Sequence, residues 1–256
     1  YFENGQLKEK ANYINGNLNG PAVSYYFNGN LKKEGIYKNG EKTGEWKSYH
    51  ENGQLMEKIN TIDGILDGLW ETYYEDGQLK FTMNFIKMRQ VGIEERYYEN
   101  GQLEIQVSYV DDEENGLWKT FYDNGQIDSK GTFKYGEKDG PWEYYHKNGN
   151  LRGSGNFISD FKNGLWHWYY DNGQLNEKNN FNDGNKEGLW EEYYYNGQLR
   201  RKTNFIDNKR VGSRGDYYNN GQLRSKGSFS NDEKDGQWEY FNENGKIKEK
   251  GKYING

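Results

Sequence analysis

The stretch Gly116–Gly136, GLWKTFYDNGQIDSKGTFKYG, contains the pattern that decides the fold. Residues 117–122 are rich in aromatic side chains and predict a strand. Asn124-Gly125 follows, a dipeptide typical of two-residue type I′ hairpin turns, because both central residues of that turn need positive φ. Residues 126–133 alternate in polarity and predict the returning strand. The stretch therefore predicts one antiparallel β-hairpin.

A two-residue turn would fix the register of the two strands. We then expect three cross-strand pairs, Tyr122 with Ile127, Lys119 with Lys130 and Trp118 with Gly131. In most other units a Glu faces a Lys in place of two lysines, as Glu71 faces Lys58. A glycine opposite a tryptophan leaves room for the indole ring to lie across the sheet. That slot is filled by Gly155 and Gly227 in two other units, but by Ile59, Met83 and Val107 elsewhere.

The same pattern recurs along the whole chain with a period of 24 residues, which is typical of a repeat architecture. The first glycine of the unit, at the predicted hairpin turn, occupies Gly5, Gly29, Gly53, Gly77, Gly101, Gly125, Gly149, Gly173, Gly197, Gly221 and Gly245. A second glycine recurs with the same period from Gly20 to Gly236. The spacing predicts one continuous array, residues 1–256, of eleven tandem hairpins that each stack on the preceding one.

Columns of equivalent side chains should run across the strands of this array. A structural role is expected for the tryptophan column, Trp46, Trp70, Trp118, Trp142, Trp166, Trp190 and Trp238. The two-residue turn places on the same face the aliphatic column from Leu7 to Ile247 and a ring column from Tyr13 to Tyr253. Charged side chains and a second aromatic column, from Tyr25 to Phe241, would occupy the opposite face. The predicted fold is all-β, an elongated single-layer ribbon or solenoid.

Composition restricts the class of function. Apolar residues make up only 32% of the 256 residues, but 24 Tyr, 12 Phe and 8 Trp supply rings that a disordered chain lacks. The net charge of −6 does not favour binding to nucleic acid or to an anionic membrane. The chain has no Cys, which excludes thiol catalysis, disulfides and thiolate-bound zinc. It also has no apolar run near the ~18 residues of a membrane span.

Catalytic and metal-binding patterns are not found. His50 and His146 stand where other units have Tyr, which predicts that both are aromatic substitutes. No His pair has metal-ligand spacing, and no nucleophile–base pattern occurs. The acidic segments Asp63–Gly68 and Asp111–Glu114 do not have the spacing of known calcium loops and are predicted to be solvated turns. We therefore expect neither an enzyme nor a cofactor.

Two units break the tryptophan column, with Glu94 and Arg214 in its place, five repeats apart. This offset indicates an older block of five repeats that was duplicated. One interpretation is drift in a redundant array. The alternative is a pair of basic patches that bind an acidic partner or phosphate. The candidate partner-binding residues are Arg89, Arg96, Arg210 and Arg214, to which we add His167 and Trp168 beside Trp166.

The unit Y-Y-x-N-G-Q-L-K, followed by a ring and then G-x-x-x-G-L-W-E, resembles the bacterial variant of the MORN repeat, found in antitoxins of the YwqK type. Tyr73–Leu79, Tyr169–Leu175, Tyr193–Leu199 and Gly188–Glu191 carry this resemblance best. It covers the whole chain. The resemblance implies an elongated hairpin ribbon that acts as a scaffold or binding surface.

Three hypotheses for function follow. The favoured one is a non-catalytic protein-interaction scaffold, with an antitoxin-like or immunity-like role, whose mark would be an exposed aromatic face with a polar rim. The alternative is a surface or secreted glycan-binding array, whose mark would be similar pockets in every repeat. The third, an enzyme, is disfavoured because repeats fill the chain. We also expect either flanking sequence in the native protein, such as a preceding N-terminal segment, or end-to-end self-association. The protein is expected to be bacterial and either cytoplasmic or exported.

Overall fold

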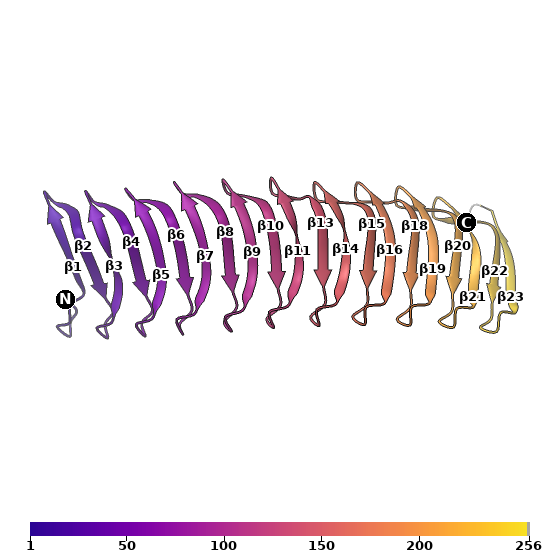
Figure 1. Ribbon diagram of the computed structural model, residues 1–256, viewed down its shortest axis with the longest axis horizontal. Coiled ribbons are helices and arrows are strands. Elements are labelled where there is room, and N and C mark those ends of the chain that lie inside the picture. The colour runs from indigo at the N-terminus through magenta and orange to yellow at the C-terminus, as the bar shows by residue number, and fades with distance from the viewer. Residues whose placement is uncertain (255–256) are drawn as a thin grey trace. The chain divides into compact units, whose positions relative to one another are not determined.

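The computed structural model describes residues 1–254. Within these residues all the regular secondary structure consists of β-strands. The chain forms two compact units, Tyr1–Gly125 (unit 1) and Gln126–Gly256 (unit 2). In each unit successive strands pair antiparallel with their neighbours in chain order, as Figure 1 shows. No helix in residues 1–254 is long and apolar enough to span a membrane. The all-β prediction and its antiparallel hairpins are confirmed.

Unit 1 contains ten strands. They are β1 (Glu9–Ile14), β2 (Asn17–Tyr25), β3 (Leu31–Lys38), β4 (Glu41–Tyr49), β5 (Leu55–Ile62), β6 (Ile65–Tyr73), β7 (Leu79–Ile86), β8 (Arg89–Tyr97), β9 (Leu103–Val110) and β10 (Glu113–Phe121). Each β-hairpin alone would be marginally stable in water, so pairing with the next hairpin is what stabilises the sheet.

Unit 2 repeats the arrangement, with two strands divided into short and long parts. Its strands are β11 (Ile127–Lys134), β12 (Glu137–Lys138), β13 (Gly140–Tyr145), β14 (Leu151–Ile158), β15 (Phe161–Tyr169), β16 (Leu175–Asn182), β17 (Asn185–Lys186), β18 (Gly188–Tyr193), β19 (Leu199–Ile206), β20 (Lys209–Tyr217), β21 (Leu223–Ser230), β22 (Glu233–Phe241) and β23 (Ile247–Tyr253).

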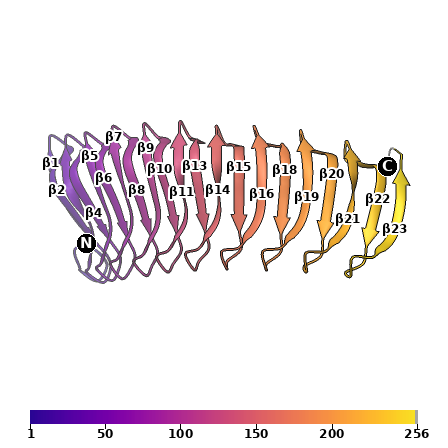
Figure 2. The same cartoon turned by 45° about the vertical axis from the view of Figure 1, so that its right-hand side comes forward.

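Two kinds of turn connect the strands, and each kind lies at one end of the strands, as Figure 2 shows. The two-residue type I′ turns join β1 to β2 and the equivalent pairs: Asn15 and Gly16 have φ of 51° and 82°, and Ile14 pairs with Asn17. The prediction of such a turn at Asn124-Gly125 is wrong. There only the glycine has positive φ, 81°, and its N–H donates to the carbonyl of Tyr122. This is a type I turn closed by a left-handed glycine.

The asparagine of this longer turn explains the difference. The Oδ1 atom of Asn28 accepts a hydrogen bond from the N–H of Asn30 at 2.9 Å, and its Nδ2 donates to the carbonyl of Glu51 at 3.0 Å. The second contact reaches the equivalent turn one repeat later. Both contacts need the asparagine in the right-handed region, so only the glycine takes positive φ.

The longer turn also reverses the side on which the leucine column lies. Tyr145 pairs with Leu151, whereas Tyr144 pairs with Gly153, so Arg152 is an extra residue in the second strand. Such a bulge moves Leu151 to the face of Tyr145, opposite Trp142. The prediction that the aliphatic column shares the tryptophan face is therefore wrong. In this repeat the pair equivalent to the one predicted for Tyr122 and Ile127 is displaced by one residue, to Tyr145 with Leu151.

The second glycine of the repeat lies at another bulge. Between β5 and β6, Thr61 pairs with Leu66 but Ile59 pairs with Trp70, so the register shifts around Gly68. Gly68 has φ of 113°, a conformation that L-residues rarely adopt. The ideal Cβ position at this glycine lies 3.0 Å from the side chain of Asn60 in the preceding strand. The glycine therefore provides both the backbone conformation and the space.

A second ladder of hydrogen bonds joins one repeat to the next at the longer turns. The hydroxyl of Tyr26 donates to the carbonyl of Tyr49 at 2.7 Å, and tyrosines at Tyr74, Tyr98, Tyr170, Tyr194 and Tyr218 make the same contact. In two repeats a histidine Nε2 replaces the tyrosine hydroxyl. It lies 3.1 Å from the carbonyl oxygen of Tyr73 for His50 and 3.0 Å from that of Tyr169 for His146. The prediction that both histidines are aromatic substitutes is confirmed.

Candidate interaction surfaces

The tryptophan face, defined in each unit by the indole rings, is closed by packing between neighbouring strands. Trp142 pairs with Gly155 of the following strand, the register that the sequence predicts. The indole nevertheless leans back over Gly131 of the preceding strand, where an ideal Cβ would lie 2.2 Å from the ring. The indole Nε1 donates to the carbonyl of Thr132 at 3.2 Å. The glycine that admits the ring is therefore the preceding one.

This geometry sorts the tryptophans by burial. Four of the indole rings lie over a glycine of the preceding strand. These four tryptophans are at most 7% exposed: Trp46, Trp142, Trp166 and Trp238. Trp70 pairs with Ile59 and Trp118 with Val107, and both indoles are only partly buried. A larger side chain below the ring therefore raises it towards solvent.

A lysine four residues before the tryptophan lies over the indole ring. Its Nζ is 4.3–4.7 Å from the ring centroid in five units, at Lys42, Lys138, Lys162, Lys186 and Lys234. Burial lowers the pKa of the Lys138 and Lys162 amines. Sequence reasoning missed this contact, although the spacing K-x-G-x-W recurs in the chain. Cation–π contacts of this type add to the packing of the face.

The two breaks of the tryptophan column each contain an ion pair inside the chain. In unit 1, Glu94 is 2% exposed, and its Oε1 lies 2.5 Å from the Nε of Arg96. In unit 2, Arg214 donates from Nε and Nη2 to Asp216, at 2.9 and 3.0 Å. Glu94 and Arg214 occupy equivalent positions, as do Arg96 and Asp216, but the acidic and basic residues of the pair are exchanged. Both breaks are therefore internally compensated, which reduces the positive charge expected of them.

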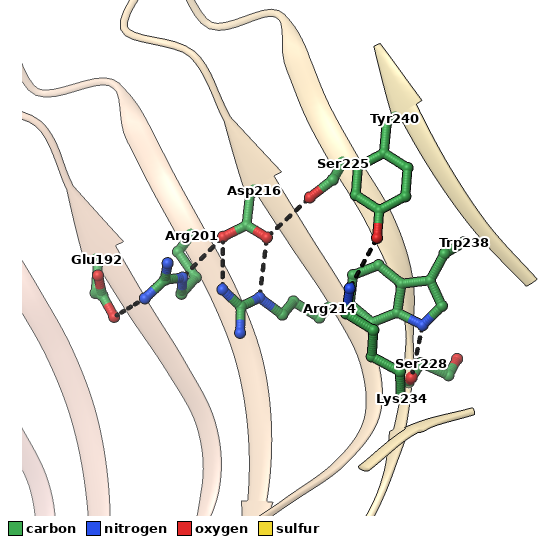
Figure 3. A network of polar contacts seen from close by, with 9 residues as sticks. All are labelled: Glu192, Arg201, Arg214, Asp216, Ser225, Ser228, Lys234, Trp238 and Tyr240. Atoms are coloured by element: carbon green, nitrogen blue, oxygen red, sulfur yellow. Dashed lines mark hydrogen bonds and ion pairs between the residues drawn. The ribbon is translucent and has the colours of Figure 1, made fainter. Parts of the chain in front are cut away.

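Figure 3 shows the larger network around Arg214. Arg201 donates from Nε to Asp216 at 2.8 Å and from Nη1 to Glu192 at 3.3 Å. The hydroxyl of Ser225 donates to Asp216 at 3.0 Å. Burial alone would raise the pKa of the Asp216 carboxyl, but hydrogen bonds from the two arginines outweigh it and hold the pKa below its ordinary value. The carboxylate is therefore charged and fixed.

The other predicted arginines also contact carboxylates. Arg210 donates from Nε to Asp232 at 2.9 Å, and its guanidinium lies 4.2 Å from the ring centroid of Phe229. Arg214 lies over the same ring at 5.5 Å, so the structure brings these two arginines together. Arg89 is exposed beside Asp111 at 3.7 Å and stands seven residues from Arg96 in β8. Partner binding by these arginines stays a prediction.

His167 and Trp168 do not form one site, because adjacent residues of a strand face opposite sides. Trp168 lies on the tryptophan face above Gly153, and its ring stacks on Trp166 with centroids 5.6 Å apart. His167 lies on the other face and stacks on Tyr169.

Hollows on the tryptophan face differ from repeat to repeat. One of about 480 Å³ is lined by Arg201, Arg214 and Asp216 with the rings of Phe229 and Trp238. Another of about 590 Å³ is lined by Trp168, Arg152 and Glu177, with His146 and Tyr170. No cluster of three or more His, Asp or Glu suited to a metal ion occurs within residues 1–254. Because the two hollows are lined by different residue types, they do not favour a ligand site that recurs in every repeat.

The opposite face, here called the charge face, carries alternating lysines and glutamates across the strands. Lys58 lies 3.1 Å from Glu71, Lys130 lies 2.6 Å from Glu143, and Lys226 lies 2.9 Å from Glu239. A tyrosine two residues after the glutamate donates its hydroxyl to the carboxylate in several units, as Tyr97 does to Glu95 at 2.6 Å. The charges and the tyrosine column predicted for this face are present.

An exposed aliphatic stripe runs beside this ladder on the charge face. Strand alternation places its members opposite the tryptophan side, near the two-residue turns. In unit 1 the stripe comprises Ile62, Ile65, Leu69, Ile86, Ile93, Val110 and Leu117, and in unit 2 it comprises Ile158, Leu165, Leu189 and Ile206, with Phe161 as its one aromatic member. Each is between 37% and 57% exposed. The sequence predicts an exposed aromatic face for a protein-binding scaffold, but the indoles are packed between repeats and the exposed apolar surface is mainly aliphatic.

Comparison with protein families gives one match. The sequence model described as "MORN repeat variant" matches eleven segments, residues 1–15, 18–39, 42–63, 66–87, 90–111, 114–135, 138–159, 162–183, 186–207, 215–231 and 234–255. The segment that contains Glu94 matches at full length. The tenth segment begins only at Gly215, so Arg210 and Arg214 lie outside it.

Solved structures and curated proteins add little. The chain is similar to structures described as TcdB2-TccC3 and TcdB2-TccC3-Cdc42, with 12% and 13% identity and TM-scores of 0.23 and 0.21. The matches cover 91% and 86% of this chain, which spans only 15% and 14% of those chains. No curated protein matches the sequence.

Proposed function

The chain belongs to the MORN repeat variant family, and from this premise we propose that it is a non-catalytic scaffold that binds a protein partner on its charge face. The single observation that carries the proposal is the exposed aliphatic stripe beside the Lys–Glu ladder. A strip of apolar side chains with a charged margin has the composition of a protein-binding surface.

The contrast between the two faces supports this choice of surface. On the tryptophan face the large rings are covered by neighbouring repeats, so Trp142 and Trp166 are at most 1% exposed. On the charge face Leu165 and Leu189 are each 45% exposed. A partner that covered these aliphatic side chains would remove apolar area from water, which contributes about 25 cal/mol per Å² before the costs of association.

The test is affinity capture from a lysate of the source organism, with proteins identified by mass spectrometry. The double variant Leu165→Glu/Leu189→Glu should lose a partner that the unaltered chain retains in stoichiometric amount, because each carboxylate would be desolvated at the interface. Gln174→Glu/Gln198→Glu is the matched control, since it adds the same two charges at exposed positions of the longer turns, away from the stripe. Equal capture by the double variant would reject the charge face as the binding surface.

An antitoxin-like role in a bacterium is a finer form of this proposal. It rests on the resemblance of the repeat to those of YwqK-type antitoxins. The partner would then be a toxin protein, and co-expression with the chain should restore growth of cells that produce it. Growth rescue that the Leu165→Glu/Leu189→Glu variant cannot supply would support the role. Partners captured on the stripe that are harmless when expressed alone would contradict it.

A glycan-binding array is the competing proposal, supported by the stacked rings of Tyr144, Trp166 and Trp168. Tyrosine and tryptophan faces are suited to stacking on sugars, and Trp168 borders a hollow. Saturable binding of cell-envelope glycans that Trp168→Ala abolishes, without a stoichiometric protein partner, would favour this function over the scaffold.

A further inference from the structure

The Lys–Glu ladder of the charge face has a regular composition in most of unit 2. The register places Glu191 between Lys178 and Lys202, and it places Glu239 between Lys226 and Lys250. Both lysines lie close to Glu239, at 2.9 and 2.7 Å. The Glu239 carboxylate is thus shared between lysines of the two flanking strands, whereas among the described residues Glu191 pairs only with Lys178, at 3.9 Å.

Gly215 interrupts this ladder. It pairs with Lys202 on one side and Lys226 on the other, the place that a glutamate holds in neighbouring repeats. Within residues 1–254, Lys202 has no ion pair, and the only ion pair of Lys226 is with Glu239 on its far side, where its amine also lies over the Phe241 ring. Gly215 does not adopt positive φ, so the backbone does not require a glycine here.

A tyrosine hydroxyl points to the same vacancy. Tyr193 donates to Glu191 at 3.1 Å, and Tyr145 donates to Glu143. The equivalent ring of Tyr217 lies beside Gly215, with its hydroxyl 3.1 Å from the ideal Cβ position of the glycine. Its hydroxyl has no side-chain acceptor among the described residues. The ladder position at Gly215 therefore lacks a carboxylate, lies in register between two lysines, and is covered by the ring of Tyr217.

The equivalent position of unit 1 shows what this arrangement accommodates. Five repeats earlier the residue is Glu95, whose carboxylate accepts hydrogen bonds from Tyr97 at 2.6 Å and from Gln106 at 2.8 Å. Tyr97 and Gln106 correspond to Tyr217 and Lys226. A carboxylate therefore fits between these strands, and at Gly215 a lysine replaces the neutral amide.

The vacancy opens into a hollow of about 530 Å³ on the charge face. Its lining includes Lys202, Gly215, Lys226 and Tyr217, with Leu223 as an apolar surface. We propose that this notch at Gly215 binds the carboxylate of an acidic side chain in a protein partner, which replaces the glutamate missing between Lys202 and Lys226. The proposal deepens the scaffold function and rests on it, because the notch lies on the face assigned to the partner.

Binding of a defined probe tests the notch without knowledge of the partner. An acetylated, amidated hexaglutamate peptide is titrated into the intact ¹⁵N-labelled chain, and amide shifts of Gly215 and Gly227 are followed by NMR. Saturable shifts are expected that weaken with added salt, because the contacts are ionic. A hexaglutamine peptide should leave these amides unmoved. Hexaglutamate that fails to shift them would overturn the proposal.

The decisive variant is Gly215→Glu, which supplies the missing carboxylate from the chain itself. Peptide binding should be lost although both lysines are retained. The folded spectrum should persist because the backbone does not have positive φ there, and the added Cβ displaces only the end of the Tyr217 ring, 3.1 Å away. Lys202→Gln should weaken binding about fivefold, the upper range for one exposed ion pair. Lys178→Gln is the matched control beside an intact Glu191 and should have no effect. Undiminished binding to Gly215→Glu would overturn the site.

Further experiments distinguish an acidic protein segment from a small anion as the ligand, and they separate the notch proposal from the scaffold proposal. Sodium acetate or inorganic phosphate that binds the notch as tightly as the peptide would overturn an acidic segment as its ligand. The Leu165→Glu/Leu189→Glu chain should still bind hexaglutamate, because neither leucine lines the notch. Loss of partner capture in that variant with retained peptide binding supports both proposals. Retained capture together with loss of peptide binding in Gly215→Glu rejects only the stripe.

Discussion

At the scale of single residues, pairs of a small and a large side chain decide how well the repeats pack. The glycine of one strand and the tryptophan of the next act together, since the indole of Trp166 fills the space above Gly155 and is fully buried. Where Ile59 replaces the glycine, Trp70 is raised, and its Nε1 donates to Glu57 at 3.1 Å rather than to the backbone. Burial of each ring is thus set by a residue eleven positions earlier.

Gly155→Ala should destabilise the chain, because its Cβ would lie 2.1 Å from the indole of Trp166. Overpacking of this kind costs about 1–3 kcal/mol in the free energy of unfolding. Urea denaturation monitored by tryptophan fluorescence measures it. Gly251→Ala is the matched control in the same column, where the added Cβ makes an ordinary 3.5 Å contact with Tyr253. A loss no greater than in the control would contradict the proposed packing.

Alkaline pH should weaken the fold through Tyr97. Burial, together with its hydrogen bond to Glu95, raises the pKa of this phenol to about 12, from an unfolded value near 10. A raised folded pKa stabilises the native state fully below about pH 10, and this contribution is lost as pH rises towards 12. Tyr97→Phe should therefore reduce the fall in stability between pH 10 and 12. Denaturation midpoints across that range measure this, and an unchanged slope would count against it.

At the scale of the hairpin, the longer turn combines a local and a long-range function in one asparagine. Asn148 accepts from the N–H of Asn150 within its own turn at 3.0 Å and donates to the carbonyl of Asp171 in the next turn at 2.9 Å. The neighbouring His146 makes a further contact between repeats, from its Nε2 to the carbonyl of Tyr169. Turn conformation and stacking of repeats are thus coupled.

Substitutions at Asn148 should separate these two functions. Asn148→Asp keeps the acceptor for the turn but removes the donor to Asp171, whereas Asn148→Ala removes both. We expect losses of about 1 kcal/mol for the first and about 2 kcal/mol for the second, since each net hydrogen bond contributes about 1 kcal/mol. Thermal unfolding followed by circular dichroism measures the order. Equal effects would indicate that the contact between turns contributes nothing.

At the scale of the whole chain, each hairpin contacts mainly the hairpins beside it, within both units. Pairing follows chain order throughout the described strands of a unit. In such an array stability is approximately a sum of repeat and interface contributions. The charge-exchanged pairs Glu94–Arg96 and Arg214–Asp216 are local variations in this scheme.

Deletion of one whole repeat should therefore be tolerated, whereas a deletion out of register should not. Removal of residues 174–197 joins equivalent positions and should leave a folded chain with reduced stability. Removal of residues 174–196 leaves one extra residue, which would turn the following side chains to the wrong face. Circular dichroism and denaturation midpoints compare the two chains. A well-folded product of the second deletion would contradict the dependence on register.

Much of the fold was determined by the sequence alone. The 24-residue period, the aromatic strands and the register of Trp142 with Gly155 all follow from local patterns, because side chains alternate with a period of two along a strand. The structural role of the tryptophans followed from the same spacing, as did the places of His50 and His146 among the tyrosines.

Only the tertiary structure decided which face each column occupies and what remains exposed. Asn-Gly is compatible with two turn types, and the choice depends on hydrogen bonds to a turn 23 residues away, which no local pattern contains. That choice adds a bulge, moves Leu151 to the charge face and so leaves the indoles packed and the aliphatic stripe open. The vacancy at Gly215 likewise appears only when Lys202 and Lys226 are brought to its two sides by the sheet.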